Sequence, residues 1–259
     1  MTARPLLALL AALLLAGSVA ACGADDEASG SNPDQVVVSA ASSLNKAFTT
    51  YGDEFEGGDV KLSFAGSDEL AAQIRQGVKP DVYAAANTTL PDELYKEGLV
   101  ERPVRFATNE LVLAVPADGG KVASLDDLTG NGVTIAIGAE GVPVGDYTRT
   151  VLGELPADQS QAILANVRSN EPDVAGIVGK LTQGAVDAGF VYRSDVEGAG
   201  GKLRAIELPD ALKPTVEYGV AVVKGAPDPE GAQAFIDGLR DGAGADALKA
   251  NGFGRPPGT

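Results

Sequence analysis

V-V-V-S-A-A-S-S-L at residues 36–44 is the stretch that decides the fold, and F-A-G-S-D-E-L at 64–70 repeats its plan. In each stretch an apolar run leads into small residues and then into a helix signal. A strand, a tight turn and a helix form the repeating unit of an open α/β sheet. Two such units in succession predict parallel strands whose carboxyl ends lie at one edge of a sheet.

The same alternation continues along the chain in both directions from these stretches. Apolar runs of four to eight residues predict strands, and apolar residues at helical spacing predict helices. A first set of elements ends with an apolar strand at 111–115, and a second set follows it. The expected strands of the second set are 133–137, 166–168, 188–192, 203–208 and 216–223, and the expected helices are 145–152, 158–165, 174–183, 229–239 and 243–250.

Two α/β sets of about 100 residues each predict two lobes. The sequence has no Pro/Gly-rich linker between the sets, which favours a chain that crosses between lobes through strands and then returns. We expect the crossings near Asn109–Glu110 and near Val216–Glu217. The predicted lobes are therefore residues 35–110 together with 217–259, and residues 111–216.

The first 22 residues predict export. Arg4 gives a basic start, residues 6–15 are nearly all Leu and Ala, and small residues precede Cys22. The apolar run is shorter than the ~20 residues that a transmembrane helix needs, and it is typical of a lipoprotein signal in which Cys22 becomes lipidated. An ordinary secretory signal is the alternative. Residues 23–34 are expected to form a flexible tether, so the protein would be extracytoplasmic and lipid-anchored to the outer face of the cell membrane.

Composition excludes several classes of function. The 259 residues carry a net charge of −16, which argues against binding of nucleic acid, because that needs a basic surface. Histidine is absent and Cys22 is the only cysteine, which removes His-based catalysis, His-ligated zinc and an intrachain disulfide. Carboxylate-pair catalysis and pure binding remain. Any bound anion must be held by local donors against the overall negative field.

Five segments could bring hydrogen-bond donors to a common site. Two are the turns with Ser42–Ser43 and Ser67, and the others are 141–147, 170–176 and 189–195. Helix N-termini carry unpaired N–H groups and a partial positive charge, which suits an anion. Helix capping explains each turn equally well when the turn is taken alone. Ligands of open α/β sheets bind at the carboxyl ends of strands, however, where both serine turns are expected.

The ordered set of these segments resembles the molybdate-binding receptors (ModA-like) of ABC transporters, which have the type II periplasmic-binding-protein fold. A-S-S-L at 41–44 is similar to that family's A-A-S-L turn, and F-A-G-S at 64–67 to its F-A-[GS]-S turn. P-D-V-Y-A-A-A-N at 80–87 resembles its P-A-D-[LV]-[FY]-x-S-A strand. V-P-V-G-D-Y at 142–147 resembles its V-P-A-G-x-Y segment. The similarity runs from about residue 36 to the C-terminus.

The resemblance implies two α/β lobes with mostly parallel sheets, helices on both faces and a cleft between the lobes. The implied oxyanion ligands are the hydroxyl and backbone N–H of Ser43 and Ser67, the backbone N–H of Val144 and Val174, and the phenol of Tyr192, with Ser42 as an adjacent alternative. The family implies no catalysis, no cofactor, and no metal other than the molybdenum of bound molybdate. The implied partners are a small oxyanion and an ABC permease in the membrane, and the receptor is expected to be a monomer.

Several alternatives stay open at this point. Molybdate and tungstate have nearly the same size and charge, so the sequence does not separate them. A proton-free dianion needs donors only, whereas phosphate keeps a proton near neutral pH and favours an acceptor. Asp68, where the family often has a small neutral residue, could be that acceptor and make the protein a phosphate receptor, although an outward orientation is favoured. A carboxylate-dependent hydrolase of cell-wall glycans and a non-transport adhesin or sensor are the remaining alternatives.

Overall fold

The computed structural model describes residues 35–256, so the signal segment, Cys22 and the tether lie outside the described residues. Helices and strands alternate along this range, and three short 3₁₀ turns (η) interrupt them. The elements in chain order are β1 (Gln35–Ala41), η1 (Ser42–Leu44), α1 (Asn45–Glu54), β2 (Asp59–Ala65), α2 (Ser67–Arg75), β3 (Val82–Ala85), α3 (Thr89–Lys96), β4 (Val104–Asn109), β5 (Leu111–Pro116), η2 (Asp126–Thr129), β6 (Ile135–Gly138), α4 (Pro143–Gly153), α5 (Ala157–Ala165), β7 (Val167–Glu171), α6 (Val174–Thr182), β8 (Ala188–Tyr192), α7 (Arg193–Gly198), β9 (Leu203–Ile206), η3 (Asp210–Leu212), β10 (Val216–Val222), α8 (Pro229–Asp241) and α9 (Ala243–Ala250).

Among the described residues the strands form two five-stranded sheets, in the orders β2-β1-β3-β10-β4 and β7-β6-β8-β5-β9. In the first sheet β1 runs parallel to β2 and β3, while β10 runs antiparallel to β3 and β4. The second sheet repeats this plan, with β6 parallel to β7 and β8, and β5 antiparallel to β8 and β9. The two-lobed α/β fold is therefore confirmed, and its sheets are mixed rather than mostly parallel.

The chain passes between the sheets twice. β4 of the first sheet ends at Asn109, and β5 of the second begins at Leu111. The chain returns between β9 and β10, and Val216 already pairs with Asn109 in the first sheet. Both connections therefore lie side by side, which is the arrangement of a two-segment hinge.

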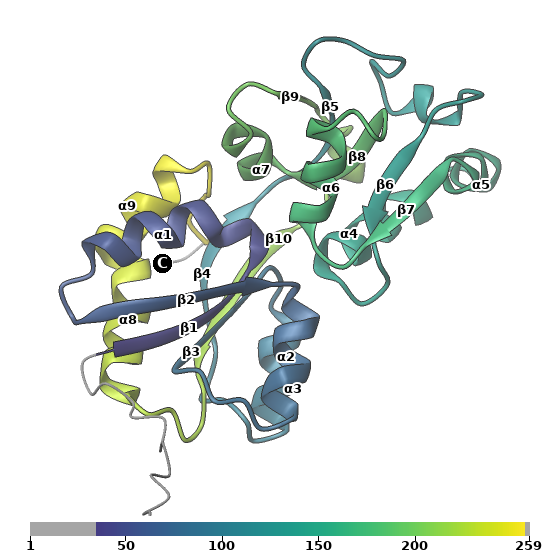
Figure 1. Cartoon of the computed structure of the whole chain (residues 1–259). Coiled ribbons are helices and arrows are strands. Elements are labelled where there is room, and N and C mark those ends of the chain that lie inside the picture. The colour runs from purple at the N-terminus through teal and green to yellow at the C-terminus, as the bar shows by residue number, and fades with distance from the viewer. Residues whose placement is uncertain (1–34, 257–259) are drawn as a thin grey trace, which may run out of the picture. The chain divides into compact units, whose positions relative to one another are not determined.

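Helices cover both faces of the first sheet. Figure 1 shows α1, α8 and α9 on one side of it and α2 and α3 on the other. The first layer is held by an aromatic cluster in which the rings of Phe48 and Tyr51 lie 5.5 and 4.6 Å from the ring of Phe235. In the second lobe α6 packs with α7, and α4 packs with α5. None of the helices within residues 35–256 is long and apolar enough to cross a bilayer.

Strand register brings the predicted turns together within each lobe. Ala41 at the end of β1 pairs with Ala65 at the end of β2, so the η1 and α2 turns begin at the same level. In the second lobe Gly138 at the end of β6 pairs with Glu171 at the end of β7, so the α4 and α6 turns also begin side by side. The carboxyl ends of the parallel strands thus present two helix starts from each lobe.

Candidate functional site

One small cavity is lined by residues from both lobes, and all six predicted oxyanion-binding residues line it. Its volume is about 10 Å³, far below the ~300–1,000 Å³ of pockets for larger organic ligands. The cavity therefore suits a small ion. Its lining is Ala41, Ser42, Ser43, Ala65, Gly66, Ser67 and Ala86 from the first lobe, and Val142, Pro143, Val144, Asp173, Val174 and Tyr192 from the second.

Ser43 reaches the cavity from the short η1 turn after β1. The residue is 9% exposed, and its hydroxyl oxygen lies 3.0 Å from the phenol oxygen of Tyr218 on β10. The amide of Asn109 donates to the same phenol at 3.5 Å and to Ser194 Oγ at 2.8 Å. Because Tyr218 accepts from Asn109, it can donate to Ser43, which leaves the Ser43 proton for a ligand. Ser42 lines the same cavity and is less deeply buried.

Ser67 is the first residue of α2 and is 2% exposed. Its hydroxyl accepts a hydrogen bond from the backbone N–H of Ala86 at 3.1 Å, and its carbonyl accepts one from the phenol of Tyr83 at 2.8 Å. A hydroxyl that accepts from a backbone N–H still has its own proton to donate. Ser67 is thus held in place by β3 and the residue that follows it, with a free donor beside the cavity.

The capping alternative does not describe these serines. The N-cap of α2 is Gly66 and the N-cap of η1 is Ala41, and neither turn has a side-chain cap hydrogen bond. A Cβ on Gly66 would lie 2.5 Å from the carbonyl oxygen of Pro172, so glycine is required where this turn meets the second lobe. Ser43 and Ser67 are therefore buried hydroxyls that serve a different purpose from helix capping.

Val144 stands in the first turn of α4, behind Pro143 at the first helical position. Its side chain is 1% exposed, and the first backbone hydrogen bond of the helix runs from Asp146 N to Val142 O at 2.9 Å. The N–H groups before Asp146 have no partner within the helix. Gly145 packs against β6 so closely that a Cβ there would lie 2.1 Å from the carbonyl oxygen of Ala139. This contact fixes the start of α4 at the cavity.

Val174 is the first residue of α6 and is 4% exposed. The preceding residue, Asp173, caps the helix, and its carboxylate accepts from Gly176 N at 2.9 Å. The cap satisfies the third N–H of the helix and leaves the N–H of Val174 at the cavity. The second lobe thus offers main-chain donors from two helix starts.

Tyr192 ends β8 and is 1% exposed. Its phenol oxygen is buried and, within the described part of the chain, has no hydrogen-bond partner. Burial raises the pKa of Tyr192 well above its usual value, so the phenol keeps its proton and remains a donor. A buried hydroxyl without a partner costs about 1–3 kcal/mol, which makes Tyr192 the clearest sign that a ligand completes this site.

Acidic side chains lie near the cavity, whereas no Lys or Arg from residues 35–256 lines it. Asp173 is engaged as the cap of α6. Asp68 does not line the cavity, but one of its carboxylate oxygens is buried without a partner, so the outward orientation that we favoured from sequence is wrong for this oxygen. Burial raises the pKa of Asp68, and hydrogen bonds from the backbone of Asp68 and Glu69 oppose that rise. The donors at the site are all neutral.

Sequence reasoning missed Tyr218 and Asn109 as members of the site. Tyr218 is fully buried on β10, and its ring lies 5.9 Å from the ring of Tyr192. Burial raises the pKa of Tyr218 well above its usual value. A tyrosine in a mostly buried strand is a usable signal, because a buried phenol needs a partner. The residues 35–256 hold no group of His, Cys, Asp and Glu that could bind a metal ion directly.

Comparison with known proteins fits this geometry. Residues 36–254 match the family described as bacterial extracellular solute-binding protein. The chain is 36% identical to the molybdate-binding protein ModA of Mycobacterium tuberculosis, over 96% of this chain and 97% of that protein. It is 30% identical to ModA of Escherichia coli, over 97% and 98% of the two chains. The periplasmic molybdate-binding protein of Azotobacter vinelandii has the same fold, with a TM-score of 0.76, 22% identity, and coverage of 85% of this chain and 99% of that one.

These relatives confirm the resemblance inferred from the turns, and they confirm the prediction of a non-enzymatic protein, because they are solute-binding proteins. The chain therefore belongs to the bacterial extracellular solute-binding proteins and, within them, to the ModA family of molybdate-binding proteins.

Proposed function

We propose that this protein captures molybdate or tungstate between its two lobes and delivers the ion to an ABC permease. The observation that carries the proposal is the convergence of neutral donors from both lobes on one small cavity without a cationic side chain. The proposed ligands are Ser43, Ser67, Val144, Val174 and Tyr192, with Ser42 as an adjacent contributor. The names of the ModA relatives point to the same ion.

The chemistry of the donors favours a fully deprotonated oxyanion. Each oxygen of such a dianion accepts hydrogen bonds, and hydrogen bonds to a charged acceptor contribute about 1.5–3 kcal/mol each. Hydroxyl and backbone donors held by packing can supply them without burying a cation, whose desolvation would be costly. The cavity would select against larger solutes through its size. Its one lining carboxylate, Asp173, already accepts from Gly176 N as the cap of α6.

The hydrogen-bond partners of Ser43 leave its hydroxyl proton available to point toward the ion. Asn109 donates to Tyr218, so Tyr218 can donate to Ser43, and in the proposed complex Ser43 donates to the ion. A chain of hydrogen bonds that all point the same way polarises its last donor toward the anion. Because Asn109 ends β4 beside the crossing to β5, this chain also links the site to the hinge between the lobes.

Two finer parts of the function rest on the sequence and on the sheet topology, respectively. The apolar run before Cys22 supports lipidation of that cysteine, which would hold the receptor at the outer face of the membrane near its permease. The two connections between the sheets support closure of the lobes around the ion, with the closed form docking on the permease.

A phosphate receptor is the second candidate, and the buried oxygen of Asp68 favours it. A carboxylate next to the α2 turn could accept the proton of hydrogen phosphate. Asp68 does not line the cavity, however, and a Cβ on Gly66 would lie 2.8 Å from its unpartnered oxygen and 2.5 Å from the Pro172 carbonyl oxygen of the second lobe. We therefore assign it to the contact between the lobes rather than to the ion.

Titration calorimetry of the purified protein with molybdate, tungstate, sulfate and phosphate tests the proposal. Molybdate and tungstate should bind in a 1:1 ratio, and sulfate and phosphate should bind far more weakly. Strong binding of phosphate alone would instead support the second candidate function, a phosphate receptor. Absence of heat with all four anions, together with unchanged melting temperatures, would refute an oxyanion receptor. Radiolabelled palmitate incorporation, compared between the wild type and Cys22→Ser, tests the anchor separately.

A further inference from the structure

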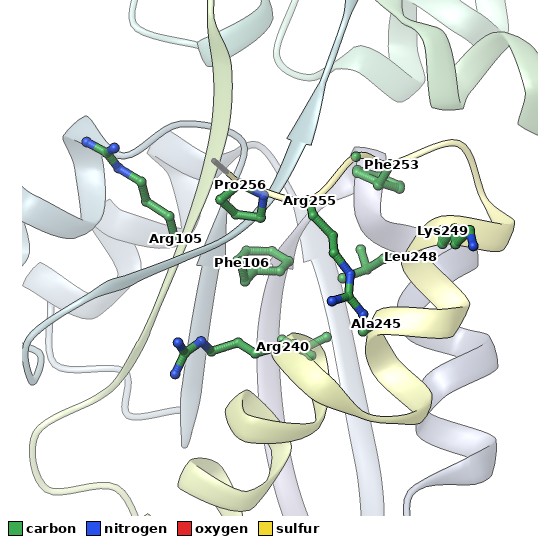
Figure 2. A pocket seen from close by; sticks show the side chains of 11 residues that line it. Arg105, Phe106, Arg240, Ala245, Leu248, Lys249, Phe253, Arg255 and Pro256 are labelled. Atoms are coloured by element: carbon green, nitrogen blue, oxygen red, sulfur yellow. The ribbon is translucent and has the colours of Figure 1, made fainter. Parts of the chain in front are cut away.

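A second cavity, on the first lobe, shares no residue with the oxyanion cavity. Its volume is about 310 Å³, at the lower end of the range for small-molecule sites. Its residues come from β4, from α8 and α9, and from the C-terminal segment after α9. Figure 2 shows this cavity with the side chains that surround it.

Pairing of the C-terminal segment with β4 forms the cavity. Gly254 exchanges two backbone hydrogen bonds with Thr108, of 2.8 and 2.9 Å, and this bridge carries the segment across the sheet. Phe253, just before the bridge, packs its ring 5.4 Å from the ring of Tyr218. The floor of the cavity is apolar and is formed by Phe106, Leu239, Ala245, Leu248 and Phe253.

The rim of the cavity is cationic. Arg105, Arg240, Lys249 and Arg255 line it, and no acidic residue of the described chain does. Arg105 pairs with Glu217 at 3.4 Å. Among residues 35–256 the structure gives no ion pair or side-chain hydrogen bond to the other three.

Other basic side chains within residues 35–256, such as Lys61, Lys79 and Arg204, also have no ion pair, whereas Arg75 and Arg193 each contact two acidic residues. What distinguishes this cluster is its position around an apolar cavity that no acidic residue of the described chain lines. In Figure 2 the Arg255 side chain extends over the cavity toward Ala245, whereas Arg105, Arg240 and Lys249 point away from its edge in different directions. An anion in the cavity would contact Arg255 directly, and the positive charges of Arg105, Arg240 and Lys249 would act on it from a greater distance.

We propose that this cavity binds a small amphipathic organic anion, with an apolar group of a few carbons on the floor and a single carboxylate beside Arg255. Apolar contact with the floor supplies burial of surface, at roughly 25 cal/mol per Å², and the guanidinium supplies the paired charge. A hydrated inorganic ion would gain nothing from the apolar floor. A membrane surface fits the concave shape poorly.

Titration of the protein with hexanoate and benzoate tests the proposal, with hexanamide and benzamide as uncharged analogues of the same shape. Chemical-shift changes in NMR spectra, or heats of binding, report the affinity. The acids should bind more tightly than the amides, and added salt should weaken the acids selectively, because exposed charges are screened. Equal affinity for acid and amide would overturn the proposal.

Matched variants separate the site from general surface charge. Arg255→Gln should weaken the binding of hexanoate about three- to fivefold, which is within the range for an exposed ion pair. Ala245→Leu should reduce binding because the larger side chain would fill the cavity. Arg204→Gln, which removes the same charge from an exposed position on β9 of the second lobe, should leave binding unchanged. An equal loss in Arg204→Gln would show that binding follows net charge. Binding that appears only after removal of residues 257–259 would make the chain's own end the occupant and refute the external ligand.

Discussion

Replacing Tyr192 by Phe should lower the affinity for the ligand and, at the same time, raise the stability of the ligand-free protein. The Tyr192 hydroxyl is buried without a partner. Its deletion removes an unsatisfied group that costs about 1–3 kcal/mol, so the free energy of unfolding should rise by about 1 kcal/mol or more. For a chain of this size each kcal/mol raises Tm by about 2–4 °C. The same deletion removes the proposed hydrogen bond to a dianion, which should weaken the binding of molybdate about 10- to 150-fold.

Thermal melts without ligand and calorimetric titrations with molybdate measure the two effects separately. Tyr51→Phe is the matched control, because the Tyr51 hydroxyl is also buried but donates to the carbonyl of Phe235 at 3.0 Å. Its loss should lower the free energy of unfolding by the cost of an ordinary hydrogen bond, about 1 kcal/mol, and Tm with it. Molybdate affinity should stay unchanged. A lower Tm in Tyr192→Phe with unaltered affinity would show that the phenol has a structural role alone, and the assignment of the site would fail.

Three further substitutions extend the test. Ser67→Ala should weaken molybdate by about 1.5–3 kcal/mol in a calorimetric titration, and an affinity equal to the wild type would make this hydroxyl a packing element that bonds Ala86 and nothing more. Gly145→Ala should destabilise the protein by about 2–4 kcal/mol in urea unfolding, because the added Cβ would lie 2.1 Å from the Ala139 carbonyl oxygen, and a neutral result would contradict this packing. Asp195→Asn tests the pH dependence of stability. Burial raises the pKa of Asp195 from 3.8 to about 7 in the folded protein. Between about pH 4 and pH 7 the unfolded chain releases this proton more readily, so the wild type loses stability as pH rises through that window. The Asn variant should gain stability relative to wild type across that window in melts at several pH values, and parallel curves would refute the shift.

The local sequence was sufficient for the elements that carry the site. The turns at Ser43 and Ser67 could be predicted because a strand, small residues and a helix signal follow one another within a few positions. Strand β4 was missed, since V-R-F-A-T-N at 104–109 has no clean alternation and is held by pairing with β10 and Gly254. At the expected return crossing, Val216 pairs with Asn109 of β4 in the first sheet.

Long-range contacts account for what the sequence could not supply. Tyr218 lies 175 residues from Ser43 along the chain, so no local pattern relates the two hydroxyls. One oxygen of Asp68 is buried, and both it and the carbonyl oxygen of Pro172 in the other lobe lie close to Gly66. Acids in a first helical turn normally complement the helix dipole from a solvated position, and the local sequence does not indicate that this oxygen is buried.

In the proposed function Val144 and Val174 donate from the main chain, and this has a consequence for how the site can change over time. Any side chain that packs at these two positions leaves the peptide N–H in place, so substitutions there can accumulate with the donor set intact. Apart from the Tyr192 phenol, the second lobe's proposed donors are consequently encoded in backbone path rather than residue identity. Alanine scanning would overlook these two main-chain donors, whereas proline, which lacks the amide proton, at position 144 would delete one of them.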